Sequence, residues 1–145
     1  MPASLATSVA GTFVWLGMVL AISFIEAPVK FRAPGVTLKL GLGIGRLVFR
    51  ALNACELVLA VVVIIGLLTG DPGSGPVAAL GVAVVVLVTQ LLLVRPLLTR
   101  RSDAVLAAPE GADGPRSHAH LWYVGTELVK VVALLVGGIL LLGAG

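Results

Sequence analysis

The stretch that decides the fold is CELVLAVVVIIGLL, residues 55–68, in which Glu56 is followed by twelve uncharged residues. A second stretch, TELVKVVALLVGGILL at residues 126–141, places Glu127 in a similar setting. Apolar segments of about 18–20 residues are long enough to cross a bilayer as helices. Both stretches lie in segments of that length, so each predicts a membrane-spanning helix with a carboxylate near its start.

The composition of the whole chain supports a membrane protein. The chain has 145 residues, of which 59% are hydrophobic and 12% are charged, whereas a soluble domain carries about 25% charged residues. Backbone groups in hydrocarbon must form their hydrogen bonds within the segment, which favours helices. We therefore predict an all-α integral membrane protein, a four-helix up-down-up-down bundle that forms a single transmembrane domain over residues 1–145. The four helices are expected at about residues 8–27, 46–69, 77–96 and 121–142.

Basic residues predict the orientation, because Lys and Arg accumulate on the cytoplasmic side of membrane proteins. They occur between the first and second helices and between the third and fourth, and the turn at residues 70–76 and both termini lack them. The basic loops are then cytoplasmic and both termini extracytoplasmic, in the cell (inner) membrane, with residues 100–120 as a mobile cytoplasmic loop. Basic residues interleaved with aromatics on a soluble face are absent, which argues against a nucleic-acid partner.

The chain also contains a weak internal repeat. The Glu-Leu-Val triplets at residues 56–58 and 127–129 correspond, and the first and third helices both end in a proline and a cation. Two helix hairpins that run in the same direction would give a parallel repeat about an axis along the membrane normal.

Polar residues within the helices predict the functional site. A charge within a membrane helix costs at least about 2.5–3.5 kcal/mol on insertion scales, so such residues normally face the bundle interior and a partner. Helical spacing places Tyr123, Glu127 and Lys130 in one stripe and Asn53 beside Glu56. We expect an inward cluster near the cytoplasmic side with basic residues at its mouth. Its members are Glu26, Asn53, Glu56, Tyr123, Glu127 and Lys130, and its mouth is formed by Arg46, Arg50 and His120.

Several functions are compatible with this cluster. The main hypothesis is a cytoplasm-facing intramembrane pocket that binds or transports a small ligand, an ion or a proton. The alternative is a set of buried ion pairs that only fixes helix register, as in a structural accessory subunit of a larger membrane complex. A transport path through so small a bundle predicts a homo-oligomer or a partner subunit in the bilayer.

The sequence identifies neither catalytic residues nor a cofactor. His118 and His120 are weak candidates for a metal site, because imidazoles suit transition metals. On a helix, however, two residues two positions apart point in nearly opposite directions. Both could bind one ion only if the chain there is extended, so no metal is favoured.

Several residues resemble the small four-helix membrane family that includes the cisplatin-resistance-associated transmembrane protein. The resemblance covers most of the chain through loose motifs. The two membrane acids that are followed by Leu-Val in this chain are not part of that family's pattern. It implies a polytopic membrane protein of unsettled role, linked to export or to metal-drug tolerance. The matching positions are Trp15, Phe24, Phe31-Arg32, Gly45, Val48-Phe49, Arg95-Pro96 and His118 or His120.

A second resemblance is to the membrane-associated eicosanoid and glutathione enzymes, which are trimers of four-helix subunits. The run RALNACE at residues 50–56 is similar to their second helix, although the spacing from Arg50 to Asn53 is one residue short. The resemblance implies a membrane-embedded, thiol-dependent enzyme. Glutathione or a related thiol would then contact Arg50, Asn53, Glu56 and Tyr123.

Overall fold

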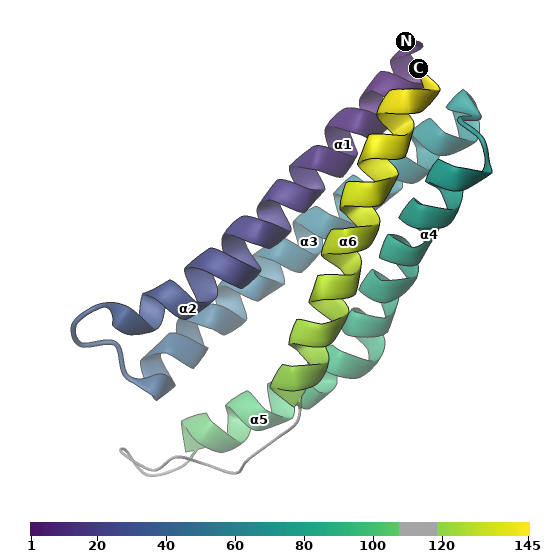
Figure 1. Ribbon diagram of the computed structural model, residues 1–145. Coiled ribbons are helices and arrows are strands. Elements are labelled where there is room, and N and C mark those ends of the chain that lie inside the picture. The colour runs from purple at the N-terminus through teal and green to yellow at the C-terminus, as the bar shows by residue number, and fades with distance from the viewer. Residues whose placement is uncertain (108–118) are drawn as a thin grey trace.

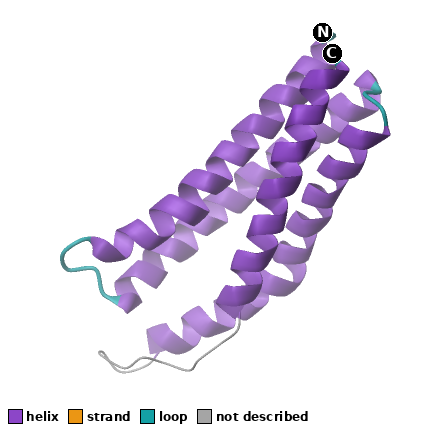
Figure 2. Ribbon diagram, viewed as in Figure 1, coloured by secondary structure: helices purple, strands orange, loops and turns teal. Residues whose placement is uncertain are grey.

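The computed structural model describes residues 1–107 and 119–145, and every element in this part of the chain is helical. Four helical rods run in alternating directions (Figures 1 and 2). The first comprises α1 (Ala3–Val19), the π-helix η1 (Leu20–Glu26), α2 (Ala27–Val29) and the 3-10 helix η2 (Lys30–Arg32). The second is α3 (Leu38–Gly70), and the fourth is α6 (Ala119–Ala144). The third comprises α4 (Ser74–Thr89), the π-helix η3 (Gln90–Val94) and α5 (Arg95–Ala107). The predicted all-α four-helix architecture is confirmed.

The rods are longer than the sequence predicted. A break was expected after Ala27, because Pro28 cannot continue an α-helix normally, and a loop was expected from residue 100. Instead the first rod continues to Arg32 and the third to Ala107. The rest of the loop expected over residues 100–120 lies mainly outside the described residues.

Pro28 of the first rod and Pro96 of the third are each accommodated by a π-helix. A proline ring clashes with the carbonyl four residues earlier, and widening the helix by one residue per turn relieves this clash. Phe24, four residues before Pro28, lies within η1, and Leu92, four residues before Pro96, lies within η3. Each π-helix ends two residues before its proline. The first and third rods therefore share a feature that is consistent with the proposed hairpin repeat.

The rods do not all pack on one another to the same extent. α1 packs extensively on α3 and also on α6, and α6 packs extensively on α4. By contrast α3 and α4 make few contacts, although only a short turn joins them. Trp15, Val63, Leu80 and Leu134 are buried at the centre of the core.

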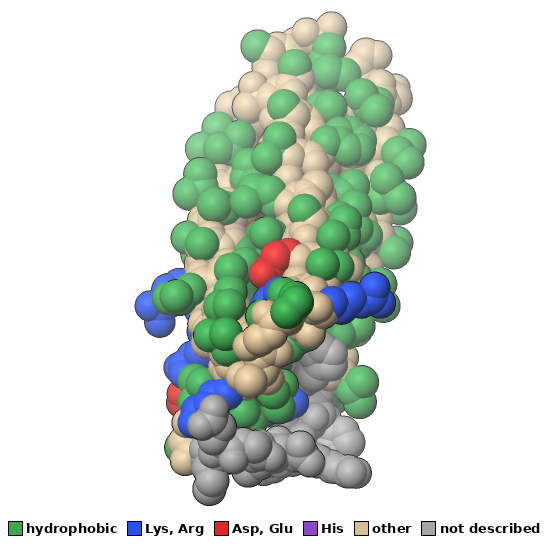
Figure 3. Space-filling view, turned by 90° about the vertical axis from the view of Figure 1, so that its left-hand side faces the viewer, with side chains coloured by type: hydrophobic (Ala, Val, Ile, Leu, Met, Phe, Trp, Pro, Cys, Tyr) green, Lys and Arg blue, Asp and Glu red, His purple; other side chains and the backbone are tan. Residues whose placement is uncertain are grey.

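The distribution of side chains is reversed relative to a water-soluble bundle. Large aliphatic residues are exposed along every rod, whereas Glu56, Glu127 and Lys130 are at most 1% exposed. Figure 3 shows hydrophobic side chains along the face in view and basic ones gathered toward its lower part. All four rods are long and apolar enough to cross a bilayer. Exposed aliphatic surface on this scale suits a lipid environment, and the four rods are compatible with a multi-pass membrane protein.

The two ends of the bundle differ. Both termini and the turn between α3 and α4 lie at one end, and the α2–α3 connection and α5 lie at the other (Figure 1). At the α5 end, Arg46 of α3 and Asp103 of α5 form an ion pair at 2.9 Å. This pair joins the two basic segments, which therefore lie at the same end of the bundle, as the sequence predicted.

Candidate functional site

The centre of the candidate site is the ammonium group of Lys130 on α6. Its Nζ atom lies 2.6 Å from Glu56 Oε2 and 2.6 Å from Glu127 Oε1, and it donates to Gln90 Oε1 at 2.7 Å. An ammonium group has three hydrogens, so these three partners use all of them. Lys130 thereby connects α6, α3 and η3 through one buried group.

Glu127 has several donors. Gln90 Nε2 donates to its Oε1 atom at 3.3 Å, in addition to the contact with Lys130. Its Oε2 atom accepts from Ser23 Oγ at 2.6 Å and from the Tyr123 hydroxyl. Four donors therefore converge on this one carboxyl group.

Glu56 is less completely satisfied. Its Oε2 atom accepts from Trp15 Nε1 at 3.0 Å and from Lys130. Its Oε1 atom is buried and has no hydrogen-bond partner among the described residues. The two acids of the cluster therefore differ, since Glu127 uses both oxygens and Glu56 uses one.

The cluster contains more acid than base. Glu56 and Glu127 are two carboxyl groups and Lys130 is one ammonium group, so the fully ionised cluster carries a formal charge of minus one. The groups that α1, η1 and η3 add are neutral, namely Trp15, Ser23 and Gln90. In the described chain, no second cation contacts either carboxyl group.

The cluster lies far from the end of the bundle that carries the termini. Glu56 is fourteen residues before the end of α3 and Lys130 is fourteen before the end of α6. At 1.5 Å per residue this is about 21 Å from the end that carries the termini. If the hydrocarbon core, about 30 Å thick, began at that end, the cluster would lie in the half nearer the basic end.

Two of the predicted members, Glu26 and Asn53, do not join this cluster, and neither does Arg50 of the predicted mouth. Glu26 pairs with Lys30 at 3.7 Å, eleven residues along the first rod from Trp15. Asn53 is half-buried and forms no side-chain hydrogen bond with a described residue, and Arg50 is exposed. Of the four residues expected to contact a thiol, Glu56 and Tyr123 take part in the cluster and Arg50 and Asn53 do not, and a thiol site there stays a prediction.

The two histidines fall outside what the structure describes. His118 lies in the undescribed segment, and the side chain of His120 is likewise not described. Among the described residues, no group of three metal-ligating side chains occurs.

The site includes neutral residues that sequence reasoning did not assign to it. Trp15, Ser23 and Gln90 were not among the predicted members of the cluster. Ser23 lies within η1 and Gln90 opens η3, so both π-helices supply a polar group to the cluster. The prolines that follow were the available signal, because π-helices are frequent at functional sites.

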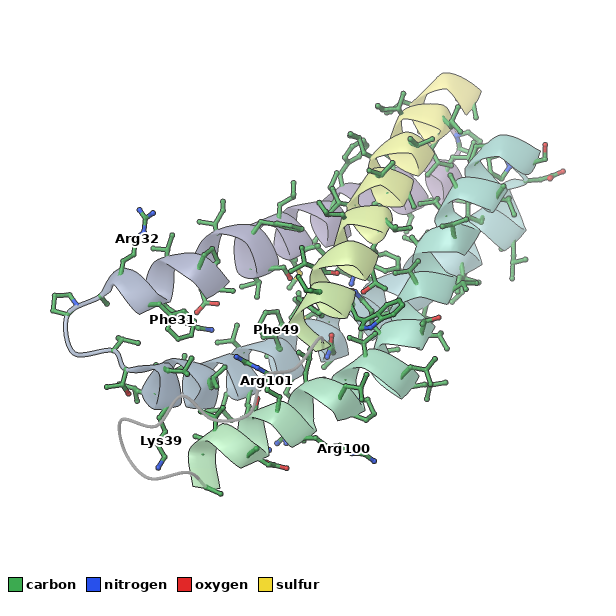
Figure 4. The ribbon with its side chains drawn as sticks, turned by 60° about the horizontal axis from the view of Figure 1, so that its bottom comes forward. Phe31, Arg32, Lys39, Phe49, Arg100 and Arg101 are labelled. Atoms are coloured by element: carbon green, nitrogen blue, oxygen red, sulfur yellow. The ribbon has the colours of Figure 1, made fainter. Side chains whose placement is uncertain are left out.

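A line of contacts extends from the cluster toward the basic end. Phe49 packs edge-to-face against Tyr123, with ring centroids 5.3 Å apart, and Lys30 Nζ lies 5.8 Å from the Phe49 centroid. Gly45 admits this lysine, since a Cβ atom there would lie 2.9 Å from Lys30 Nζ. Figure 4 shows Phe31 and Phe49 turned into the bundle, whereas Arg32 and Lys39 extend outward.

The surface hollows lie outside the cluster. One, of about 580 Å³, is lined by apolar residues of α4 and α6 together with Thr126, which accepts from Gln90. Another, of about 490 Å³, lies between α3 and α5 near Lys39. The polar atoms of the cluster contact one another instead of lining either hollow.

Comparisons of the chain with protein-family models, with curated proteins and with solved structures found no match.

Proposed function

We propose that the protein binds one proton in the Glu56–Lys130–Glu127 cluster and exchanges it with the cytoplasmic side. The observation that carries the proposal is the excess of one buried carboxyl group over the single buried cation. A net charge within hydrocarbon is strongly unfavourable. One bound proton makes the cluster neutral.

Glu56 is the group that holds this proton. Glu127 accepts four contacts from donors, which suits a carboxylate, whereas Oε1 of Glu56 accepts none in the described structure. A proton on Oε1 leaves Oε2 free to accept from Trp15 and Lys130. A proton also needs no cavity, which agrees with the dense packing of the polar atoms.

The hydroxyls of Tyr123 and Ser23 provide the exchange route. They are within hydrogen-bond distance of each other at 2.8 Å, and both contact Glu127. Tyr123 comes four residues before Glu127 on α6 and so lies on the basic side of the acids, where it packs on Phe49. Hydroxyl groups both donate and accept, so they can pass a proton between this end and the acids.

Infrared spectroscopy of the purified protein in lipid tests this function. The carboxylic C=O band of the buried acid should be present at neutral pH and should shift after transfer to D₂O. We expect Tyr123→Phe and Ser23→Ala to slow that shift without removing the band. Thr89→Val is the matched control, because the Thr89 hydroxyl donates only to Val85 O on an exposed face.

The outcomes separate clearly. A band that exchanges more slowly in both hydroxyl variants than in the control supports the route through Tyr123 and Ser23. Absence of the band from the wild-type protein would show that the cluster holds no proton, and the proposed function would fail.

Orientation and assembly complete the proposal. The basic end is placed in the cytoplasm and both termini outside, on the strength of the positive-inside rule. A homo-oligomer or a partner subunit is proposed because one slim bundle offers little room for a separate substrate path. Native mass spectrometry in gentle detergent should show more than one subunit, and a bare monomer would contradict this part.

A further inference from the structure

The hollow of about 490 Å³ between α3 and α5 is a groove with apolar walls at the basic end of the bundle. Its lining on α3 follows one helical face, because the lining positions recur at intervals of three and four residues. Two of its leucines, Leu40 and Leu47, are 50% and 68% exposed, so the groove is open to the surroundings of the protein. The lining includes Lys39, Leu40, Gly43, Ile44 and Leu47 of α3 and Leu106 of α5.

Gly43 gives the groove its free space. A Cβ atom added at Gly43 would meet no described atom of a neighbouring element within 4 Å. Two other glycines of the same helix lie against neighbours, since a Cβ atom would meet the Phe31 ring at Gly41 and Lys30 Nζ at Gly45. The face of α3 toward the first rod is therefore closely packed, whereas no described part of the chain fills the groove beside Gly43.

Positive charge surrounds this groove. The segments 26–50 and 95–107, which meet at this end, hold eight Lys and Arg residues against two acids. Lys39 lines the groove near the first turn of α3, where the positive end of the helix dipole also favours an anion. The Arg46–Asp103 pair joins the two helices that form the walls. Figure 4 shows Lys39 on α3 and Arg100 and Arg101 on α5 at this end of the bundle.

The charge distinguishes between two possible occupants. A second copy of the chain in the same orientation would bring the same surplus of positive charge to this end, and like charges repel. An anionic phospholipid matches both features of the groove, because it combines an apolar chain with a negative headgroup. Basic pockets between helices at a membrane surface suit such headgroups.

We propose that the groove between α3 and α5 binds an anionic phospholipid. One acyl chain lies along Leu40, Ile44 and Leu47, and the phosphate group lies at Lys39. This site is separate from the Glu56–Lys130–Glu127 cluster and does not depend on the proton bound there.

Native mass spectrometry of the purified protein with added lipid tests the site. The probes are phosphatidylglycerol, which is anionic, and phosphatidylcholine with the same acyl chains, which is zwitterionic. The wild type should bind the first phosphatidylglycerol molecule more tightly than phosphatidylcholine. Glycerol phosphate has the anionic group without the chains, so it should not displace the bound lipid.

Two substitutions separate the headgroup contact from the chain contact. Lys39→Gln removes one cation and should weaken phosphatidylglycerol binding by about fivefold. Gly43→Leu adds a side chain to the free space of the groove and should weaken binding by about tenfold, because it displaces part of the acyl chain.

Each substitution has a matched control. Arg32→Gln removes the same charge from an exposed residue of the first rod that does not line the groove. Gly81→Leu adds the same side chain at a half-buried glycine of α4 that likewise has free space around it. Both controls should bind phosphatidylglycerol as the wild type does.

Several outcomes would overturn the site. They are equal affinity of the wild type for the two lipids, displacement by glycerol phosphate, unchanged binding in both Lys39→Gln and Gly43→Leu, and an equal loss in Arg32→Gln. A changed subunit count in Gly43→Leu with unchanged lipid binding would show that a second copy occupies the groove instead. None of these variants should alter the carboxylic band, so the lipid site and the proton site can fail separately.

Discussion

Two sets of ion pairs in this molecule have similar geometry but different surroundings. Lys130 lies 2.6 Å from each of its two acids, and all three side chains are 1% exposed or less. Arg46 lies 2.9 Å from Asp103 at the basic end, where the two side chains are 38% and 59% exposed. Distance alone would rank these pairs as near equals.

The surroundings make their energetic roles different. Water and ions screen the Arg46–Asp103 pair, and exposed pairs contribute about 0–1 kcal/mol. A buried charge that loses its partner has no such screening and costs about 3–5 kcal/mol. Hence the exposed Arg46–Asp103 pair at the rim of the bundle can be changed with little effect on stability. The central cluster must stay balanced in charge.

The largest effect is expected for Lys130→Met. It leaves Glu56 and Glu127 buried without their shared cation, so the free energy of unfolding should fall by about 3–5 kcal/mol. Reversible unfolding in mixed detergent micelles measures this loss. Arg46→Met is the matched control, because Arg46 pairs with Asp103 at 2.9 Å where the two side chains are 38% and 59% exposed. Equal losses in the two variants would abolish the distinction between centre and rim.

A smaller effect is expected when either acid is replaced by its amide, and the two acids should differ. Glu127→Gln places an NH₂ group among donors, so we expect a loss of about 1–3 kcal/mol in unfolding free energy. Glu56→Gln resembles the protonated acid, and its loss should stay below about 1 kcal/mol. The same unfolding assay compares them, and a larger loss for Glu56→Gln would show that the proton is assigned to the wrong acid.

Trp15→Phe should have an effect similar to the loss of one buried hydrogen bond. The ring still fills the core, but the N–H group that donates to Glu56 at 3.0 Å is removed. A loss of about 1 kcal/mol is expected in the same assay. An unchanged stability would mean that the indole serves only as packing.

The smallest effect is expected for Asp103→Asn at the rim. The exposed Arg46–Asp103 pair should contribute less than about 1 kcal/mol, and this contribution should shrink as salt is added. Unfolding measured at low and high ionic strength checks both points. A large loss that is independent of salt would place this pair in the same class as the central cluster.

Most of the architecture could be predicted from the sequence. Hydrophobic length and the bilayer requirement for internal hydrogen bonds define the four helices, and the basic residues predict which loops share an end. The helix ends were harder to predict from the sequence, because Pro28 and Pro96 suggested breaks that the two π-helices avoid. Local propensity cannot show that a helix will widen to accept a proline.

The site was predicted in part. Helical spacing brought Tyr123, Glu127 and Lys130 together, because contacts within one helix follow from its periodicity. Contacts between helices depend on rotation and depth, which no single helix defines. Glu26 was therefore expected too close to the centre, and the roles of Trp15, Ser23 and Gln90 became apparent only from the packed structure.

The number of buried protonated carboxyl groups at neutral pH tests the central claim most directly. With seven Asp and Glu residues in the chain, the carboxylic C=O band can be assigned by substitution. We predict one protonated group in the wild type and none in either Glu56→Gln or Glu127→Gln, because each variant leaves one acid beside Lys130. Asp103→Asn should keep the band. A wild-type protein without the band, or a band that survives in both Gln variants, would contradict the claim that charge balance holds a proton in this cluster.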